Sequence, residues 1–435
     1  MQSMQTMALS LRRSLSWSLG GRGIYAFSQW MMLLVLARMG GLEAVGRFAL
    51  ALAVTGPIIL FSNLGLRHVQ ATDAAETYAY ADYLAVRAWT TVAALVVLAV
   101  LTPLANYPGE TGQVIALVAL AKAVESMSDV VHGLEQVHRR MDLTTWSLGL
   151  RGVAGVAAMT LGYWLTGHLT GAIAAMTAAW AATYLVHDLA AQRRLLAERS
   201  IDAPPVSPVA PPDRRLQRAR RLRLARVAAP MGVVALLLSL NVNVPRYFIE
   251  AWLGERALGA FAAMFYFVVV GSLVVNGLGQ AALVDLARYH ASGQRAAFFR
   301  LLGLLFVGCL ALGAAGVATA WLFGQPLLGL LYGEAFTDAA PLFLWIMFAG
   351  ALNYAAAALF FGVTARRIFA GQAALYTVVT AVNAGGCALW IGGHGMLGVV
   401  WAWIAALVVQ IALSLVLLAR SSGRAAPPPM PVVAP

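Results

Sequence analysis

Residues 14–38 read SLSWSLGGRGIYAFSQWMMLLVLAR, which is long and apolar enough to cross a lipid bilayer as one helix. Arg22 lies inside this stretch, where a charged side chain costs roughly 2.5–3.5 kcal/mol on insertion scales. Ser18, Tyr25 and Gln29 share its helical face, at positions i−4, i+3 and i+7. A membrane helix with such a cationic, hydrogen-bonding stripe is better suited to line a wet cavity than to face lipid. The stretch therefore favours a membrane helix beside the path of a negatively charged cargo.

The whole chain has the composition of a membrane protein with many spans. Of its 435 residues, 61% are hydrophobic and only 11% are charged. Apolar stretches of about 20 residues recur about twelve times, and all are expected to be helices because hydrocarbon forces backbone groups to pair internally. The predicted spans are 14–38, 45–68, 83–105, 113–137, 143–166, 170–192, 226–252, 257–286, 297–323, 338–363, 368–391 and 396–419.

Basic residues recur in alternate connections between these spans. If both termini are cytoplasmic, nearly all of them fall on the cytoplasmic side, as the positive-inside rule requires. Topology thus explains the formal net charge of +12 without nucleic-acid binding. The residues that set this orientation are Arg12, Arg13, Arg139, Arg140, Arg193, Arg194, Arg199, Arg288, Arg295, Arg300, Arg366, Arg367, Arg420 and Arg424.

The longest connection divides the spans six and six. It contains the proline-rich linker APPVSPVAPPD, which is followed by RRLQRARRLRLAR. The second segment is typical either of a basic helix held on the inner leaflet by anionic lipids or of a plain basic loop. The predicted organisation is an N-terminal six-helix lobe (1–192), a cytoplasmic linker with a basic surface helix (193–225), a C-terminal six-helix lobe (226–420) and a disordered cytoplasmic tail (421–435).

The two halves of the chain also resemble each other in sequence, at an offset of 213 residues. This pattern predicts an internal duplication, with two six-helix bundles of the same orientation related by a pseudo-two-fold axis along the membrane normal. The matching residues are Gly41, Ala44, Gly46, Phe48, Ala49 and Asn63 in the first half, and Gly254, Ala257, Gly259, Phe261, Ala262 and Asn276 in the second.

The fourth span carries charges at membrane depth. Lys122, Glu125 and Asp129 fall on one helical face. One interpretation is an ion-pair ladder that holds the first bundle together. The other is a cavity wall in which a carboxylate exchanges H⁺ or Na⁺ to drive transport. With two acids and one base, a carboxylate remains for another cation, such as Arg22 or Arg151.

Further polar residues lie in the fifth and seventh spans. Arg151 either contacts cargo or neutralises the acids of the fourth span. Asn243, Arg246 and Glu250 share one face, and Glu250 lies one turn beyond Arg246, so a salt bridge between them is expected. The candidate cargo-binding residues are Arg22, Tyr25, Gln29, Arg151, Arg246 and Asn243. The candidate ion-coupling or charge-network residues are Lys122, Glu125, Asp129 and Glu250.

No sequence motif indicates catalysis. The phosphate-binding pattern G-x-x-x-x-G-K-[ST] does not occur, and the seven histidines show no metal-ligand spacing. We therefore expect no catalytic residue, no metal and no cofactor.

Two segments resemble a known family. The stretch GRGIYAFSQWMMLLVLARMGGLEAVGRFALALAVTGPIILFSNLGL and the later PMGVVALLLSLNVNVPRYFIEAWLGERALGAF are similar to the starts of the two halves of Wzx-like lipid-linked oligosaccharide flippases. These belong to the multidrug/oligosaccharidyl-lipid/polysaccharide exporter superfamily. Where that family often carries N-x-x-x-D-[RK], this chain keeps Asn241 and Arg246 but has Pro245 in place of the acid. The resemblance implies an all-α integral membrane fold with two six-helix bundles (MATE-like).

The resemblance also implies a function. The chain would flip an undecaprenyl-pyrophosphate-linked oligosaccharide from the cytoplasmic to the periplasmic leaflet, for O-antigen, capsule or exopolysaccharide biosynthesis. It would be a multi-pass protein of a bacterial inner membrane, with both termini cytoplasmic and a polysaccharide polymerase as a potential partner. The alternatives are a cation-coupled multidrug antiporter of the same superfamily and a peptidoglycan lipid II flippase. A membrane glycosyltransferase is disfavoured because the outward loops are short.

Overall fold

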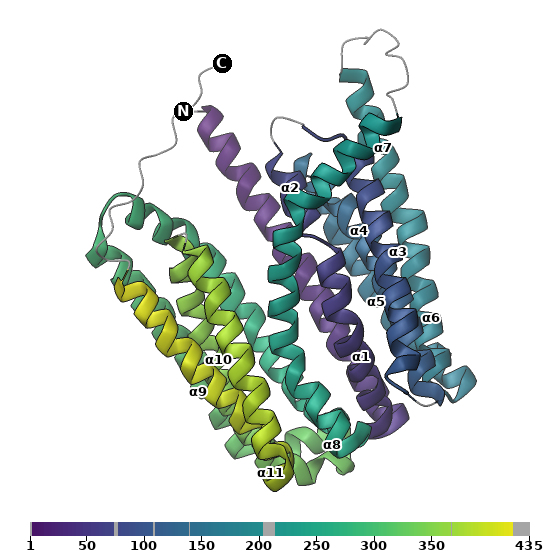
Figure 1. Ribbon diagram of the computed structural model, residues 1–435, viewed down its shortest axis with the longest axis vertical. Helices are drawn as coiled ribbons and strands as arrows, with labels where there is room; N and C mark the ends of the chain where they lie inside the picture. Colours follow the sequence, from purple (N-terminus) through teal and green to yellow (C-terminus); the bar gives the residue numbers. More distant parts are fainter. Residues whose placement is uncertain are drawn as a thin grey trace. The chain divides into compact units, whose positions relative to one another are not determined.

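The computed structural model describes residues 2–73, 77–107, 109–138, 140–202, 214–366 and 368–420. Within these ranges the chain is helical and contains no strand, which confirms the predicted all-α class (Figure 1). The elements are α1 (Gln2–Ser62), α2 (Leu66–Thr72), α3 (Tyr80–Leu104), α4 (Gly109–Val137), α5 (Met141–Thr166), α6 (Leu169–Thr183), the π-helix η1 (Tyr184–Asp188), α7 (Leu189–Asp202), α8 (Arg214–Ala291), α9 (Arg295–Tyr332), the 3-10 helix η2 (Glu334–Ala339), α10 (Ala340–Ala365) and α11 (Phe369–Arg420).

The described helices account for all the predicted spans. Eight of them are long and apolar enough to cross a membrane. Of these, α1, α8 and α11 each hold two predicted spans, joined at a glycine with positive φ: Gly41 (72°), Gly254 (81°) and Gly395 (54°). Glycine suits these kinks because it adopts positive φ at little cost. Helix α4 covers the predicted span 113–137 but is not among these eight helices, so its place as the fourth span remains a prediction.

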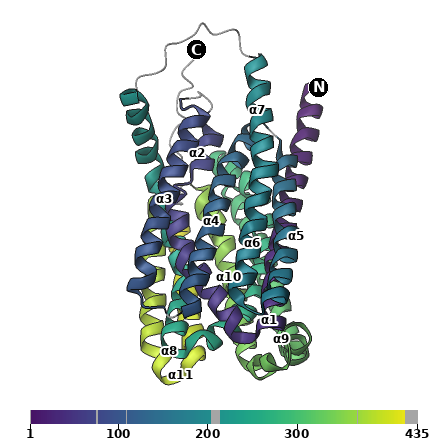
Figure 2. The same ribbon diagram turned by 90° about the vertical axis from the view of Figure 1, so that its right-hand side faces the viewer.

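The described chain forms two compact units, Met1–Ala263 and Met264–Pro435. The first contains α1 to α7 and the first part of α8, and Figure 2 shows its α3, α4, α5 and α6 running side by side. This division falls within α8, whereas the sequence places the boundary in the linker at 193–225. The proline-rich segment 203–213 and the tail 421–435 lie outside the described residues, so the organisation into six plus six helices remains a prediction.

The offset of 213 residues has a structural counterpart in the first unit. A Cβ atom on Gly46 would overlap the carbonyl oxygen of Glu255, and a Cβ atom on Gly259 would overlap that of Leu42. Leu42 and Glu255 are themselves separated by the same offset, so the contact is reciprocal. Each repeat places its glycine on the backbone of the other, and this symmetry supports an internal duplication.

Gly259→Ala is expected to destabilise the protein by about 1–3 kcal/mol, because the added methyl group overpacks the contact between α1 and α8. Thermal unfolding of the purified protein measures the effect. Gly149→Ala is the matched control, since a Cβ atom there meets no other atom, and it should not lower the unfolding midpoint. An unchanged midpoint in Gly259→Ala would show that the two backbones do not approach so closely.

The basic segment after the linker forms the first turns of α8. The helix begins at Arg214 and runs on into the membrane-spanning part without a break. Arg220 and Arg221 form ion pairs with Asp82 of α3 at 2.6 and 3.2 Å. Leu224 is fully buried in an apolar cluster with α3. Protein contacts therefore anchor this segment, and its binding to anionic lipid remains a prediction.

Candidate functional site

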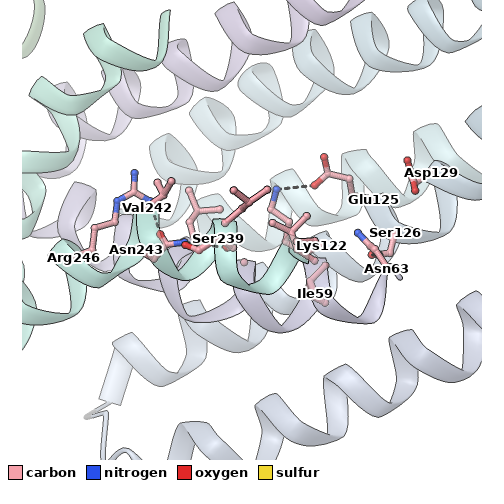
Figure 3. A pocket seen from close by; sticks show the side chains of 15 residues that line it. Ile59, Asn63, Lys122, Glu125, Ser126, Asp129, Ser239, Val242, Asn243 and Arg246 are labelled. Atoms are coloured by element: carbon pink, nitrogen blue, oxygen red, sulfur yellow. Dashed lines mark hydrogen bonds and ion pairs between the residues drawn. The ribbon is translucent and has the colours of Figure 1, made fainter. Parts of the chain in front are cut away.

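A cavity of about 710 Å³ lies within the first unit, bordered by α1, α4 and α8. Apolar side chains form part of its wall, and polar groups follow one another along it (Figure 3). A polar cavity within membrane helices is a marker of a substrate or ion path, because each buried polar group is costly there. The polar lining residues are Asn63, Lys122, Glu125, Ser126, Asp129, Ser239, Asn243 and Arg246.

Arg246 and Asn243 occupy one end of this cavity. Arg246 Nη1 donates to Asn243 Oδ1 at 3.0 Å. Asn243 Nδ2 in turn donates to the carbonyl oxygen of Ser239 at 2.9 Å and approaches its Oγ at 3.3 Å. The three residues are spaced three and four positions apart, so α8 aligns them on one face. The structure thus brings the predicted pair Asn243 and Arg246 into a cavity wall.

Lys122 and Glu125 lie at the middle of the cavity and form the predicted ion pair on α4. Lys122 Nζ is 2.7 Å from Glu125 Oε2. Tyr25 of α1 donates its hydroxyl to Glu125 Oε1 at 2.9 Å. Lys122 also lies 5.8 Å from the centre of the Trp180 ring, within the range of a cation–π interaction. Lys122 and Glu125 therefore both hold α4 against its neighbouring helices and form part of the cavity wall.

Asp129 stands at the other end and is held by two arginines. Its Oδ2 is 2.8 Å from Nη2 of Arg87, and its Oδ1 is 3.6 Å from Nη1 of Arg67. Arg87 also donates to Asn63 Oδ1, which accepts a second bond from Ser126 Oγ at 2.8 Å. This cluster ties α3, α4 and the end of α1 together beside the cavity.

Arg87 is not among the residues predicted from the sequence, although its side chain is completely buried. The signal is present, because Arg87 lies within the predicted span 83–105, where the rule applied to Arg22 would have selected it. Its partner could not be found in the same way, since pairing with Asp129 depends on how α3 and α4 pack.

Arg151 does not line the cavity formed by the described residues. It is fully buried and forms an ion pair with Asp188 of η1 at 3.2 Å. The same guanidinium nitrogen donates to Ser128 Oγ on α4. The sequence offers two roles, cargo contact or neutralisation of the acids on α4. The ion pair shown here is with a third acid, and any contact of Arg151 with cargo remains a prediction.

Three other candidates are less well defined. The side chain of Arg22 lies outside the described residues, so its role remains a prediction. Gln29 and Glu250 are partly buried and are not among the described residues that line the cavity. Their roles in cargo binding and in the charge network also remain predictions.

A second charge cluster accompanies the glycine contact between α1 and α8. Arg47 Nε is 2.7 Å from Glu255 Oε2, and Arg47 Nη1 is 2.5 Å from Glu110 Oε2. Thr111 donates its hydroxyl to the other oxygen of Glu255. These bonds join α1, α4 and α8 at the end of the unit where α1 and α8 bend.

The chemistry available in the cavity is electrostatic. Lys122 and Arg246, on two different helices, can bind an anionic group without any covalent step. Within the described part of the chain, no group of three or more His, Cys, Asp and Glu side chains could hold a metal ion.

Comparison with known proteins adds a family and a fold. A family model described as "Polysaccharide biosynthesis protein" matches residues 11–284. The chain is 24% identical over 317 residues to the capsular polysaccharide biosynthesis protein CapF of Staphylococcus aureus, covering 72% of this chain and 75% of that protein.

Solved structures of transporters resemble the chain in fold. An inward-facing multidrug resistance MATE family transporter of the MOP superfamily matches with a TM-score of 0.69 and 14% identity, over 91% of this chain and 93% of that one. A MOP superfamily transporter from Pyrococcus furiosus, described as having a binding pocket of reverse polarity that suggests a different function, matches with a TM-score of 0.56 and 14% identity over 95% and 96%. At these identities the likeness shows the fold, and it confirms the predicted MATE-like architecture.

Proposed function

The chain belongs to the polysaccharide biosynthesis protein family, and we propose on that premise that it flips an undecaprenyl-pyrophosphate-linked oligosaccharide across a bacterial inner membrane. The cargo moves from the cytoplasmic to the periplasmic leaflet, for the synthesis of O-antigen, capsule or exopolysaccharide. Two six-helix lobes alternate in access, both termini are cytoplasmic, and a polysaccharide polymerase then uses the product. The driving ion is H⁺ or Na⁺.

The observation that carries this proposal is the cationic cavity of the first unit. Sugars and a pyrophosphate cannot cross hydrocarbon unaided, because moving charged and polar groups out of water is strongly unfavourable. The prenyl chain can remain in lipid while the headgroup crosses. Lys122 and Arg246 supply charge for the pyrophosphate, and Asn243, Ser239 and Asn63 offer hydrogen bonds to sugar hydroxyl groups.

The balance of charge favours an anionic cargo. Among the described lining residues and the ion pairs given above there are four cations and two acids, a formal charge of +2. An anionic headgroup of two phosphates would balance that excess. The cations are Lys122, Arg246, Arg87 and Arg67, and the acids are Glu125 and Asp129.

A cation-coupled multidrug antiporter is the second candidate, because one matched structure is that of a multidrug resistance MATE family transporter. A cationic cargo would need an acid in the cavity, and Glu125 is the nearest such group to its centre (Figure 3). Glu125→Gln separates the two proposals. It should leave flipping of an anionic lipid intact, since it releases Lys122 from an ion pair, and it should abolish transport of a cationic drug.

Reconstitution into vesicles tests the proposed function. The purified protein should accelerate the exposure of a lipid-linked glycan to a glycosidase added outside, compared with protein-free vesicles. The Glu125→Gln variant should do the same. A peptidoglycan lipid II, which carries the same pyrophosphate, serves as the second cargo and measures sugar selectivity. Transport of a cationic dye without any movement of the glycan lipid would favour the antiporter instead.

A further inference from the structure

Helix α4 has a second polar face that is distinct from its cavity face. Ser128, His132 and Glu135 occupy positions i, i+4 and i+7, so they share one side of the helix. Their exposed fractions are 0, 3 and 0%. Their hydrogen-bond partners come from α5, since His132 Nε2 lies 3.0 Å from Ser147 Oγ and Ser128 accepts from Arg151. The first unit therefore has a buried polar layer behind the cavity wall.

Glu135 is the acid of this layer that has no ion-pair partner among the described residues. Its Oε2 accepts a hydrogen bond from the Thr144 hydroxyl at 2.6 Å. Its Oε1 has no hydrogen-bond partner among the described residues. No described cation forms an ion pair with this carboxyl group. An ionised carboxylate with one neutral donor and no exposure to water is strongly unfavourable.

Among the described residues, the neighbouring charged groups do not supply the missing partner. The described arginines near Glu135 pair with other acids, Arg67 with Asp129 at 3.6 Å and Arg140 with Asp142 at 3.0 Å, and the His187 ring lies 3.1 Å from Asp188. Asp188 itself adds a negative charge that opposes ionisation of Glu135. The titratable groups that face Glu135 are Arg67 of α2, Tyr80 of α3, Arg140 before α5, and His187 and Asp188 of η1, with His132 on the same side of α4.

We propose that Glu135 is a proton-binding site, neutral in this conformation, and that its proton is released when the first unit rearranges. The proton is held on Oε1, the carboxyl oxygen that has no hydrogen-bond partner among the described residues. This assignment differs from the expectation for Glu125 and Asp129, because both of those acids are already ion-paired in the cavity wall. A paired carboxylate favours its ionised form and is therefore a poor proton carrier.

Arg67 gives the site a route to the cavity. It bonds to Asp129 at 3.6 Å and to Gln136 Oε1 at 3.1 Å, and it is close enough to Glu135 to interact electrostatically. Loss of the proton from Glu135 would draw Arg67 away from Asp129, and this would change the charge that the cavity presents to cargo. This link rests on the proposed function, whereas the proton site itself does not.

Infrared difference spectroscopy of the purified full chain tests the proton site directly. A pH titration should show the C=O stretch of a protonated carboxylic acid that disappears as the pH rises. Glu135→Gln should remove this band, and Glu125→Gln, which alters an ion-paired acid, should leave it. A wild-type band that survives in Glu135→Gln would overturn the assignment.

Thr144→Val is the second variant, and it keeps the test decisive if Glu135→Gln does not fold. It preserves the shape of the side chain but removes the donor that stabilises the ionised form. The band should then persist to higher pH than in the wild type, and an unchanged titration would contradict the proposal. These spectra need no cargo, so a failure of glycan flipping would leave their result intact.

Vesicle transport measures the coupling separately. If the glycan lipid is flipped, an imposed pH gradient should change the rate of flipping by the wild type. The rate of flipping by the Glu135→Gln variant should not depend on the gradient. A variant rate with the full wild-type response to pH would remove Glu135 from the coupling.

Discussion

Lys122→Ala combined with Arg246→Ala should reduce transport of the glycan lipid by about 100-fold or more at limiting cargo. A charge-assisted hydrogen bond contributes roughly 1.5–3 kcal/mol, and about 1.4 kcal/mol corresponds to a tenfold change in binding. Losing two such contacts therefore exceeds two orders of magnitude. The measurement is the initial rate of flipping in vesicles, with each single variant beside the double one.

The controls separate loss of cavity charge from loss of any positive charge. Arg193 and Arg194 are exposed on α7 outside the cavity, so replacing both with alanine removes two cations and should leave the rate unchanged. Arg246→Lys keeps the charge but not the planar fork of donors, and it should restore part of the activity. A double cavity variant that transports at the wild-type rate would exclude Lys122 and Arg246 from cargo binding.

Asp129→Ala should destabilise the protein by about 3–5 kcal/mol, because it removes the carboxylate beside the completely buried Arg87. An uncompensated charge would then remain in the interior of the first unit. The expected result is a much lower unfolding midpoint in detergent, measured with the wild type under the same conditions.

Two further variants are compared with Asp129→Ala in the same unfolding measurement. Asp142→Ala breaks a pair whose side chains are 35 and 45% exposed, and it should cost only about 0–1 kcal/mol. Replacing Arg87 with methionine and Asp129 with leucine removes both charges together, and this should recover much of the stability lost in Asp129→Ala. Equal midpoints for Asp129→Ala and Asp142→Ala would show that the buried pair does not stabilise the fold.

Much of the fold could be predicted from the sequence, because hydrophobic length and helical period are local properties. The twelve spans follow from apolar runs, and the charged face of α4 follows from the 3.6-residue period. The glycine repeat also had a physical cause, since Gly46 and Gly259 allow a reciprocal backbone contact that larger side chains would block. The repeat did not show that the two spans at the start of each half form one helix, with a kink at a glycine between them.

The candidate site was harder to predict, because charge pairs depend on packing between helices. The sequence selects Arg151 but not Asp188, its partner 37 positions further along the chain. Arg87 and Glu135 were also missed. Tertiary contacts make Arg87 the counter-ion of Asp129 and leave Glu135 without an ion-pair partner among the described residues. Neither property is visible in the sequence of a single span.

Mass analysis of the lipid that co-purifies with the protein is the most direct test of the central claim. The wild type should carry a prenyl-pyrophosphate glycan, and the Lys122→Ala/Arg246→Ala variant should carry much less of it per molecule of protein. Wild-type protein that retains only ordinary phospholipid, or equal amounts of the glycan lipid in both proteins, would contradict the account.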